Sequence, residues 1–260
     1  MNIEQNQQAR QLDDQDSGYR LQQNRARDEN PYFSNKILDE EDQLGFIRKV
    51  YGILLTQITI TALCSLLPLV DEGARLFLIR NQSVVIFLMI LAIVIQCGMF
   101  CIQSLARTAP INYVLMFGFT ICEAYIVAFI CATVRNPLIV AQAAFMTAGI
   151  VFALTLYAVQ SKTDFTVMGG MAFVLAVGFI MFSMLSFLFG PTMRLIYCTL
   201  GVLIFGFYLV IDTQLLIGGR RYQLDKDDYI LAAVILYLDI INIFLYILQI
   251  LTQLMGGQKE

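Results

Sequence analysis

The sequence predicts an all-α membrane protein with seven membrane-spanning helices. Of its 260 residues, 58% are hydrophobic and only 14% are charged, and the mean hydropathy is +0.69. A soluble domain carries about 25% charged residues, so this composition favours a chain that crosses a bilayer repeatedly. Seven apolar stretches are long enough to do so, because a helix needs roughly 17–25 residues to cross a hydrocarbon core of about 30 Å.

A polar segment precedes these stretches. Residues 1–43 are rich in Gln, Asn, Asp and Arg and poor in aliphatic residues, which predicts a disordered cytosolic tail. The membrane domain is predicted over residues 44–254, and a short C-terminal tail over 255–260. The predicted spans are, in order, 50–70, 83–103, 112–132, 137–160, 166–189, 192–217 and 229–252.

Local signals support the individual spans. No basic region followed by an apolar core and a cleavage site precedes the first span, which is therefore expected to be an uncleaved signal anchor. Pro137 and Pro191 stand at the starts of the fourth and sixth spans, where proline suits the first turn of a helix. Gly and Ala are frequent in the fourth to sixth spans and permit close helix approach, which indicates a tight bundle. Short connections make sequential helices antiparallel neighbours.

Basic residues near the spans predict a cytosolic N-terminus. An excess of Lys and Arg marks the cytosolic side, and this orientation places eight of them inside and five outside. The inside set is Lys36, Arg48, Lys49, Arg107, Lys162, Arg220, Arg221 and Lys226, and the outside set is Arg75, Arg80, Arg135, Arg194 and Lys259. An odd number of spans then puts the C-terminus on the opposite side, unless one segment is re-entrant.

Three carboxylates lie inside predicted spans: Glu123, Asp212 and Asp239. An Asp at the centre of a bilayer costs about 2.5–3.5 kcal/mol on insertion scales, so it usually faces a protein interior or a water path. The midpoint of Asp212 and Asp239 falls in the loop between the sixth and seventh spans. Two antiparallel helices would therefore place both carboxylates at similar depth.

Two carboxylates at one depth predict a proton-sensitive element. In a low dielectric they do not both ionise readily, so the pair would share a proton and titrate as one unit. Loss of that proton would replace a hydrogen bond with repulsion and push the helices apart. The fully ionised pair would also suit a hard cation such as Ca²⁺. Because the chain has no His, proton sensing near neutrality would have to come from carboxylates.

Other roles are open for these residues. Each Asp could bond to a neighbour such as Asn242, Gln214 or Tyr237 and only fix helix packing. Glu123 could support packing or line a lumen. Arg107, just past the second span, could tune the pair or be an ordinary cytosolic flank.

The sequence carries no catalytic constellation. It has no HExxH, GxSxG or P-loop motif and no His for a triad. Intramembrane aspartyl proteases also use two Asp on adjacent spans, but their GxGD motif is absent at Asp212 and Asp239. The six Cys lie in apolar segments, so no disulfide framework is expected, and Cys97 and Cys101 are interpreted as small apolar filler rather than a metal pair. The chain is predicted to be no enzyme, to need no cofactor and to bind no nucleic acid.

Four stretches resemble the Bax-inhibitor-motif transmembrane family. They are FIRKVYGILLTQ at 46–57, LYAVQSKTDF at 156–165, IDTQ at 211–214 and YILAAVILYLDIINIFLYIL at 229–248. The first two resemble the Lifeguard branch of the family in particular. The resemblance covers residues 44–254 and thus all seven predicted spans.

The resemblance implies a seven-helix bundle with the last span central and six helices around it. It implies pH-dependent Ca²⁺ leak across an internal membrane, the ER or the Golgi, and suppression of cell death. In it, Asp212 and Asp239 would be the paired aspartates, Arg107 a latch to one of them, and Glu123 a family Glu in the third span. The expected partners are the bilayer, Ca²⁺, and Bcl-2-type or death-receptor proteins.

Three alternatives to a gated channel stay open. A scaffold would act through Bcl-2-type proteins or receptors and use the aspartates only for structure. A secondary transporter would exchange protons for a cation or a solute and show saturable flux. A seven-helix receptor fits less well, because such short loops leave little extracellular surface.

Overall fold

The computed structural model describes residues 31–134, 136–188, 190–218 and 226–256. These residues are helical or in short connections, without strands, and seven of the helices are long and apolar enough to cross a membrane. The predicted fold class is therefore confirmed. The chain separates into the compact units Met1–Phe46 and Ile47–Glu260, and the contacts and sites described below lie within the second unit.

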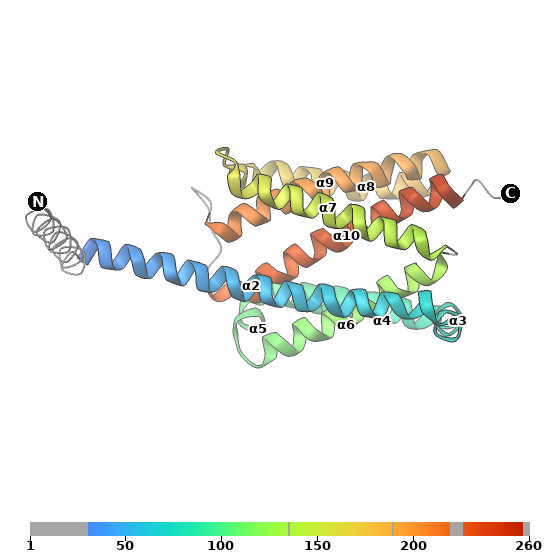
Figure 1. The fold of residues 1–260 in the computed structure, drawn as a ribbon, viewed down its shortest axis with the longest axis horizontal. Helices are drawn as coiled ribbons and strands as arrows, with labels where there is room; N and C mark the ends of the chain where they lie inside the picture. Colours follow the sequence, from blue (N-terminus) through green and yellow to red (C-terminus); the bar gives the residue numbers. More distant parts are fainter. Residues whose placement is uncertain (1–30, 135, 189, 219–225, 257–260) are drawn as a thin grey trace, which may run out of the picture. The chain divides into compact units, whose positions relative to one another are not determined.

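The helices follow one another through short connections (Figure 1). In chain order they are α2 (Pro31–Val70), α3 (Glu72–Arg80), α4 (Gln82–Cys101), α5 (Gln103–Arg107), α6 (Ile111–Thr133), α7 (Pro137–Gln160), the 3-10 turn η1 (Phe165–Met168), α8 (Gly169–Leu188), α9 (Pro191–Ile217), the 3-10 turn η2 (Lys226–Asp228) and α10 (Tyr229–Gly256). The spans are α4, α6, α7, α8 together with η1, α9, α10 and residues Asp42–Val70 of α2.

The helical content exceeds the prediction in three places. Helix α2 begins at Pro31, so residues 31–43 are helical, whereas the sequence predicted a disordered tail there. Residues 1–30 lie outside the described part of the chain. Proline suits a first helical turn, and the Lys, Leu, Glu and Gln that follow have high helix propensity. Short helices also occupy two predicted connections, α3 after the first span and α5 after the second.

Sequence signals explain where several helices start and stop. The Asn136 side chain accepts a hydrogen bond from the Leu138 amide, and Pro137 takes the first turn of α7. Asp71 caps α3 in the same way, with its Oδ2 2.7 Å from the Ala74 nitrogen. Gly218 ends α9 at a φ of 87°, a left-handed conformation that favours glycine.

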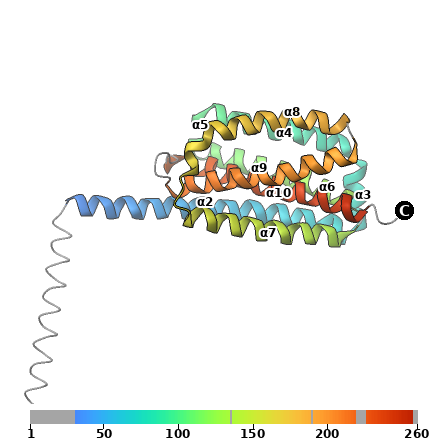
Figure 2. The same ribbon diagram turned by 90° about the horizontal axis from the view of Figure 1, so that it is seen from above.

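Helix α10 lies at the centre of the seven spans. Over its most apolar stretch 56% of the residues are buried, against 50% or less for the other six spans and only 11% for the span containing α8. It contacts α9, α7 and α6, and it runs among the other spans in both Figure 1 and Figure 2. The central last helix that the resemblance implied is therefore what the structure has.

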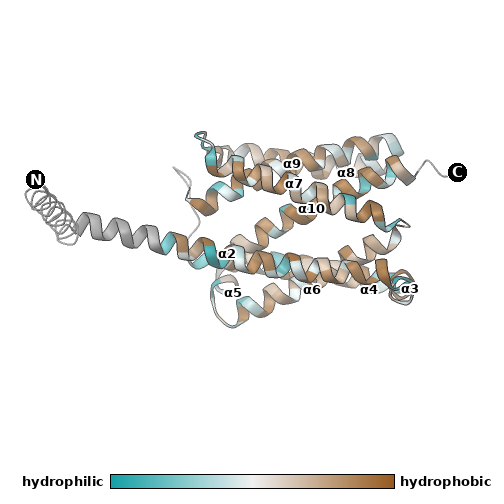
Figure 3. Cartoon of the chain, viewed as in Figure 1, coloured by the Kyte–Doolittle hydropathy of each residue, from teal (hydrophilic) through white to brown (hydrophobic). Residues whose placement is uncertain are grey.

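The outer helices present apolar side chains outward. Figure 3 shows hydrophobic residues along most of each span, and large apolar side chains such as Phe145 and Phe173 are 82% and 70% exposed. Exposed apolar surface on this scale suits a hydrocarbon surrounding. The chain is therefore a multi-pass integral membrane protein.

Candidate functional site

The structure brings Asp212 of α9 and Asp239 of α10 together. Their carboxyl groups lie close enough to interact electrostatically and to share a hydrogen bond. Asp239 is only 4% exposed and Asp212 is half-buried. An ionised carboxylate only accepts hydrogen bonds, so a bond between two carboxyl groups requires a proton on one of them. Proton sharing between the two carboxyl groups stays a prediction, and their close approach is compatible with it.

One oxygen of the pair is left without a protein partner. The Oδ2 atom of Asp239 is buried and accepts no hydrogen bond from the described residues. Such an atom is costly to bury, by about 1–3 kcal/mol. It can bind a proton or a passing cation, and both belong to the chemistry that the sequence predicts for the pair.

A tyrosine that the sequence did not single out lies beside the pair. Tyr208, one turn before Asp212 on α9, lies close enough to interact electrostatically with both carboxylates. Its hydroxyl donates to the main-chain oxygen of Ala172 at 2.7 Å and so connects α9 with α8. The spacing of four residues from Asp212 was the available signal, since residues i and i+4 share a helix face.

Glu123 belongs to a polar seam that joins α2, α6 and α10. Within it, Gln57 donates to Thr120 at 3.0 Å, and the hydroxyls of Thr61 and Tyr237 lie 2.8 Å apart. Glu123 is half-buried and close enough to Tyr237 to interact with it electrostatically. The seam reaches α10 at Tyr237, two residues before Asp239, so the central helix carries both the end of the seam and one aspartate of the pair.

Arg107 pairs with a carboxylate at the start of α10. Its Nε lies 2.7 Å from Oδ1 of Asp228 and its Nη2 lies 2.8 Å from Oδ2, which makes a two-point ion pair. The contact ties α5 to η2, immediately before the central helix. The predicted latch between Arg107 and the aspartate pair stays a prediction.

The two amides considered as supports have separate partners. Gln214 accepts from the Phe165 amide at 2.8 Å and donates to the main-chain oxygens of Thr163 and Ala158. It thereby fastens the connection after α7 onto α9. Asn242 donates to the Leu238 oxygen of its own helix at 2.8 Å.

A stripe of polar residues continues along α10 from Asp239. Its members are spaced three or four residues apart and so share one face of the helix: Asp239, Asn242, Tyr246, Gln249 and Gln253. The far end of the stripe reaches a hollow of about 570 Å³ between α6, α8, α9 and α10. Tyr246, Gln249 and Gln253 line this hollow, together with Arg194 and Tyr197 of α9.

Aromatic rings pack around Tyr246, which stands between Asp239 and Gln249 along the stripe. The ring centroids of Phe179, Tyr197 and Phe205 lie 5.7, 5.7 and 5.8 Å from that of Tyr246. The hydroxyls of Tyr246 and Tyr197 are 3.3 Å apart. A Cβ added at Gly201 would come within 2.7 Å of the Tyr246 ring, so the glycine makes room for it. We call Phe179, Tyr197, Phe205 and Tyr246 the aromatic plug.

The described residues offer few ligands for a metal. Among them, no group of three or more His, Cys, Asp and Glu side chains could hold a metal ion. Hard cations such as Ca²⁺ take six to eight oxygen ligands in a stable site. The possible contact of Ca²⁺ with Asp212 and Asp239 stays a prediction.

Comparisons with known proteins show the family of the chain. The family model described as Bax1-I, inhibitor of apoptosis-promoting Bax1, matches residues 43–256. Protein lifeguard 4 of Mus musculus is 33% identical over 214 residues, covering 80% of this chain and 85% of that protein. The BI1-like protein of Arabidopsis thaliana is 35% identical over 220 residues, covering 82% and 83%. Protein lifeguard 3 of Homo sapiens is 30% identical over 218 residues, covering 82% and 70%.

Proposed function

We propose that this chain, which belongs to the Bax1-I family of inhibitors of apoptosis-promoting Bax1, is a pH-sensitive Ca²⁺-leak channel gated by Asp212 and Asp239. Family membership carries an apoptosis-related role, and it places the chain outside the enzyme families. The observation that supports the channel is the close approach of two carboxyl groups on neighbouring membrane-spanning helices.

The pair supplies a physical gate. With one shared proton, the hydrogen bond holds α9 and α10 together at the level of the aspartates. When that proton leaves, two like charges face each other in a low dielectric, and their repulsion favours separation of the helices. The same ionised oxygens then attract a divalent cation, which would replace the lost proton as the counter-charge.

The polar stripe of α10 supplies a route for the ion. Polar side chains at membrane depth mark ion pathways, because they are costly against lipid. The route would run from the hollow beside Gln249 and Gln253, past the aromatic plug, to the aspartate pair. Arg194 at the hollow would oppose cations, so selectivity on this route would rest with the aspartates.

We also propose the membrane in which the protein acts and the partners with which it acts. We place the protein in an internal membrane, the ER or the Golgi, with a cytosolic N-terminus, as the excess of basic residues on that side favours. A Ca²⁺ leak there would lower the stored Ca²⁺ and so connect the channel to suppression of cell death. Bcl-2-type or death-receptor proteins are the partners we propose for that pathway.

The test is Ca²⁺ flux into dye-loaded proteoliposomes between pH 6 and pH 8. Wild type is compared with the double variant Asp212→Asn, Asp239→Asn, which keeps hydrogen-bonding groups but has no carboxylate to titrate. The matched control is Glu72→Gln, which neutralises an exposed carboxylate on α3. Wild type and control are expected to give a flux that changes with pH, and the double variant a flux without pH dependence.

The outcomes separate the alternatives. A pH-dependent flux that persists in the double variant would refute gating by the pair. No flux from folded wild type at any pH would favour a scaffold with structural aspartates. Flux that saturates with cation concentration and is driven by a pH gradient would favour a proton-coupled transporter.

A further inference from the structure

An apolar crevice lies between α2 and α7, with α10 as its floor. It consists of two adjoining hollows of about 190 and 580 Å³. The hollows share Ile58 of α2, Val151 and Thr155 of α7, and Ile240 of α10. All of these residues belong to membrane-spanning segments, so the surroundings of the crevice are hydrocarbon.

The larger hollow suits an apolar body. Its α7 wall is formed by small residues, including Ala141, Ala144 and Ala148. Its buried hydroxyls are already engaged, since Thr61 and Ser65 donate to main-chain oxygens of α2 at 2.9 and 2.7 Å. A cavity without free polar groups does not hold water, so this space is left for an apolar molecule from the bilayer.

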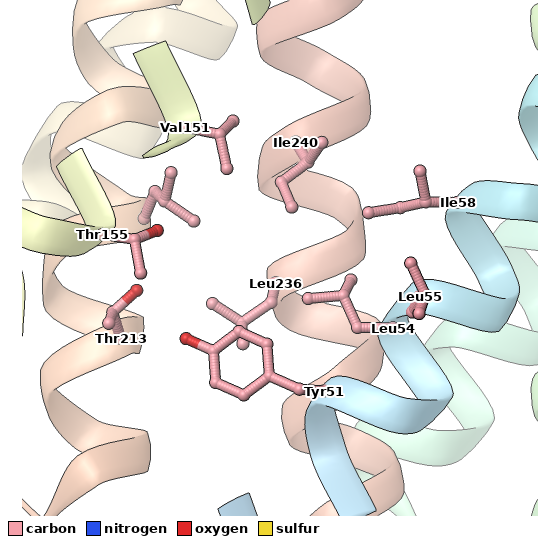
Figure 4. Close-up of a pocket in the computed structure, with 10 residues that line it drawn as sticks. Tyr51, Leu54, Leu55, Ile58, Val151, Thr155, Thr213, Leu236 and Ile240 are labelled. Atoms are coloured by element: carbon pink, nitrogen blue, oxygen red, sulfur yellow. The ribbon is translucent and has the colours of Figure 1, made fainter. Parts of the chain in front are cut away.

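The smaller hollow offers a polar group without a partner. Thr213 of α9 lines it, is 1% exposed, and its Oγ1 has no hydrogen-bond partner among the described residues. Figure 4 shows the hydroxyls of Tyr51, Thr155 and Thr213 directed toward the same end of this hollow. A ligand group that bonds there would recover the cost of the buried hydroxyl, about 1–3 kcal/mol.

The lining residues select the head group of such a ligand. No Lys, Arg, Asp or Glu is among the residues lining either hollow. A phosphate or a carboxylate head would enter this apolar space without a counter-charge, which is strongly unfavourable. The site therefore favours a neutral head that bonds through one hydroxyl.

We propose that this crevice is a sterol-binding site. A sterol combines one neutral hydroxyl with a rigid apolar body, as the two hollows require. Its hydroxyl bonds to Thr213 beside Tyr51 and Thr155, and its ring system lies against the alanines of α7. A rigid body also loses less conformational freedom on binding than a flexible acyl chain does.

The test is photolabelling of the full chain in lipid nanodiscs with a diazirine-bearing cholesterol analogue, competed by unlabelled cholesterol. Peptide mapping is expected to place the label on α2 or α7. Ala144→Leu with Ala148→Leu fills the larger hollow and is expected to abolish the competed labelling. Ala153→Leu makes the same change on an exposed part of α7 that does not line the crevice, and it should label as wild type does.

A second variant tests the head group independently of packing. Thr213→Val keeps the shape of the side chain and removes its hydroxyl, and about fivefold to tenfold weaker competition by cholesterol is expected from the loss of one hydrogen bond. Thr213→Ser should retain the affinity. Epicholesterol, with its hydroxyl on the opposite face, should compete less well than cholesterol.

Three results would overturn the proposal: equal labelling of the filled variant and wild type, label confined to other helices, or stronger competition by oleic acid or dioleoylglycerol than by cholesterol. Thermal unfolding establishes that each variant is folded. If the filled variant does not fold, competition by cholesterol in Thr213→Val tests the proposal, and competition equal to that of wild type would overturn it. The readout is binding alone, so it is independent of any ion flux.

Discussion

Gly201 of α9 lies directly against the ring of Tyr246, which α10 contributes to the aromatic plug. Its missing side chain leaves room for the Tyr246 ring, whose nearest atoms lie 2.7–2.8 Å from the position of an added Cβ. A contact this short requires the ring or the helices to move. The Tyr246 ring belongs to the aromatic plug, which the proposed ion route passes. Adding a single methyl group at position 201 would therefore act on that route.

The first prediction concerns glycine substitutions. Gly201→Ala is expected to lower the free energy of unfolding by about 1–3 kcal/mol through overpacking. Gly149→Ala on α7, with nothing within 4 Å of an added Cβ, is expected to raise it by about 0.4–1 kcal/mol because alanine restricts the unfolded chain. Thermal unfolding in detergent compares the two, and equal shifts would contradict the close approach at Gly201.

The second prediction concerns the buried hydroxyl pair of Thr61 and Tyr237. Thr61→Val is expected to cost about 1–3 kcal/mol, because it leaves the buried hydroxyl of Tyr237 unpaired. Tyr237→Phe is expected to cost about 0.5–1.5 kcal/mol, because the Thr61 hydroxyl keeps its hydrogen bond to the main-chain oxygen of Gln57. The double variant should cost less than the sum of the two, with a coupling of about 0.6 kcal/mol or more. Equilibrium unfolding of all four proteins gives the coupling, and strict additivity would mean that the 2.8 Å contact contributes nothing.

Between elements, the contact of α5 with the start of α10 fixes one end of the central helix. Arg107 and Asp228 have side chains that are 33% and 15% exposed, so water screens the pair only in part. The pair forms where η2 leads into α10, in front of the segment that carries Asp239. The ion pair therefore stabilises this end of α10, while apolar packing and the polar seam stabilise its middle.

The third prediction concerns this ion pair. Arg107→Glu is expected to destabilise the protein by about 1 kcal/mol, since it places two carboxylates together and exposed pairs are worth about 0–1 kcal/mol. Adding Asp228→Arg should restore most of the loss, and high salt should shrink both effects. Thermal unfolding at low and high salt is the measurement. A double variant less stable than Arg107→Glu alone would show that the pairing is not the stabilising contact.

At the scale of the whole molecule, seven candidate spans predict that the two ends of the chain lie on opposite sides of the membrane. Each of the seven helices is long and apolar enough to cross, and the connections between the described helices are short. An odd number of crossings then separates the termini.

The fourth prediction follows from this topology. A protease-sensitive tag at the N-terminus is expected to be cleaved from outside sealed microsomes, and the same tag at the C-terminus to be protected. Detergent permeabilisation should expose both tags. Cleavage of both tags in sealed vesicles would mean that one of the seven helices does not cross the bilayer.

Much of the site could be predicted from the position of the carboxylates. The midpoint of Asp212 and Asp239 falls in the loop between α9 and α10, and this was enough to expect both at similar depth, because helices rise by about 1.5 Å per residue. The aromatic plug could not be predicted, since it combines rings from α8, α9 and α10. The partner of Arg107 could not be predicted either, because Asp228 lies 121 residues further along the chain.

The sequence by itself determined the class of protein and the seven spans, because hydropathy and span length are properties of consecutive residues. From their positions around one loop it also predicted that the two aspartates pair. It did not determine the helical start at Pro31, where polar composition suggested disorder. Only the tertiary structure decided which side chains meet across helices: Tyr246 over Gly201, Thr61 with Tyr237, and the crevice that ends at Thr213. The rotation of each helix about its axis sets those contacts, and that rotation is fixed by packing against several neighbours at once.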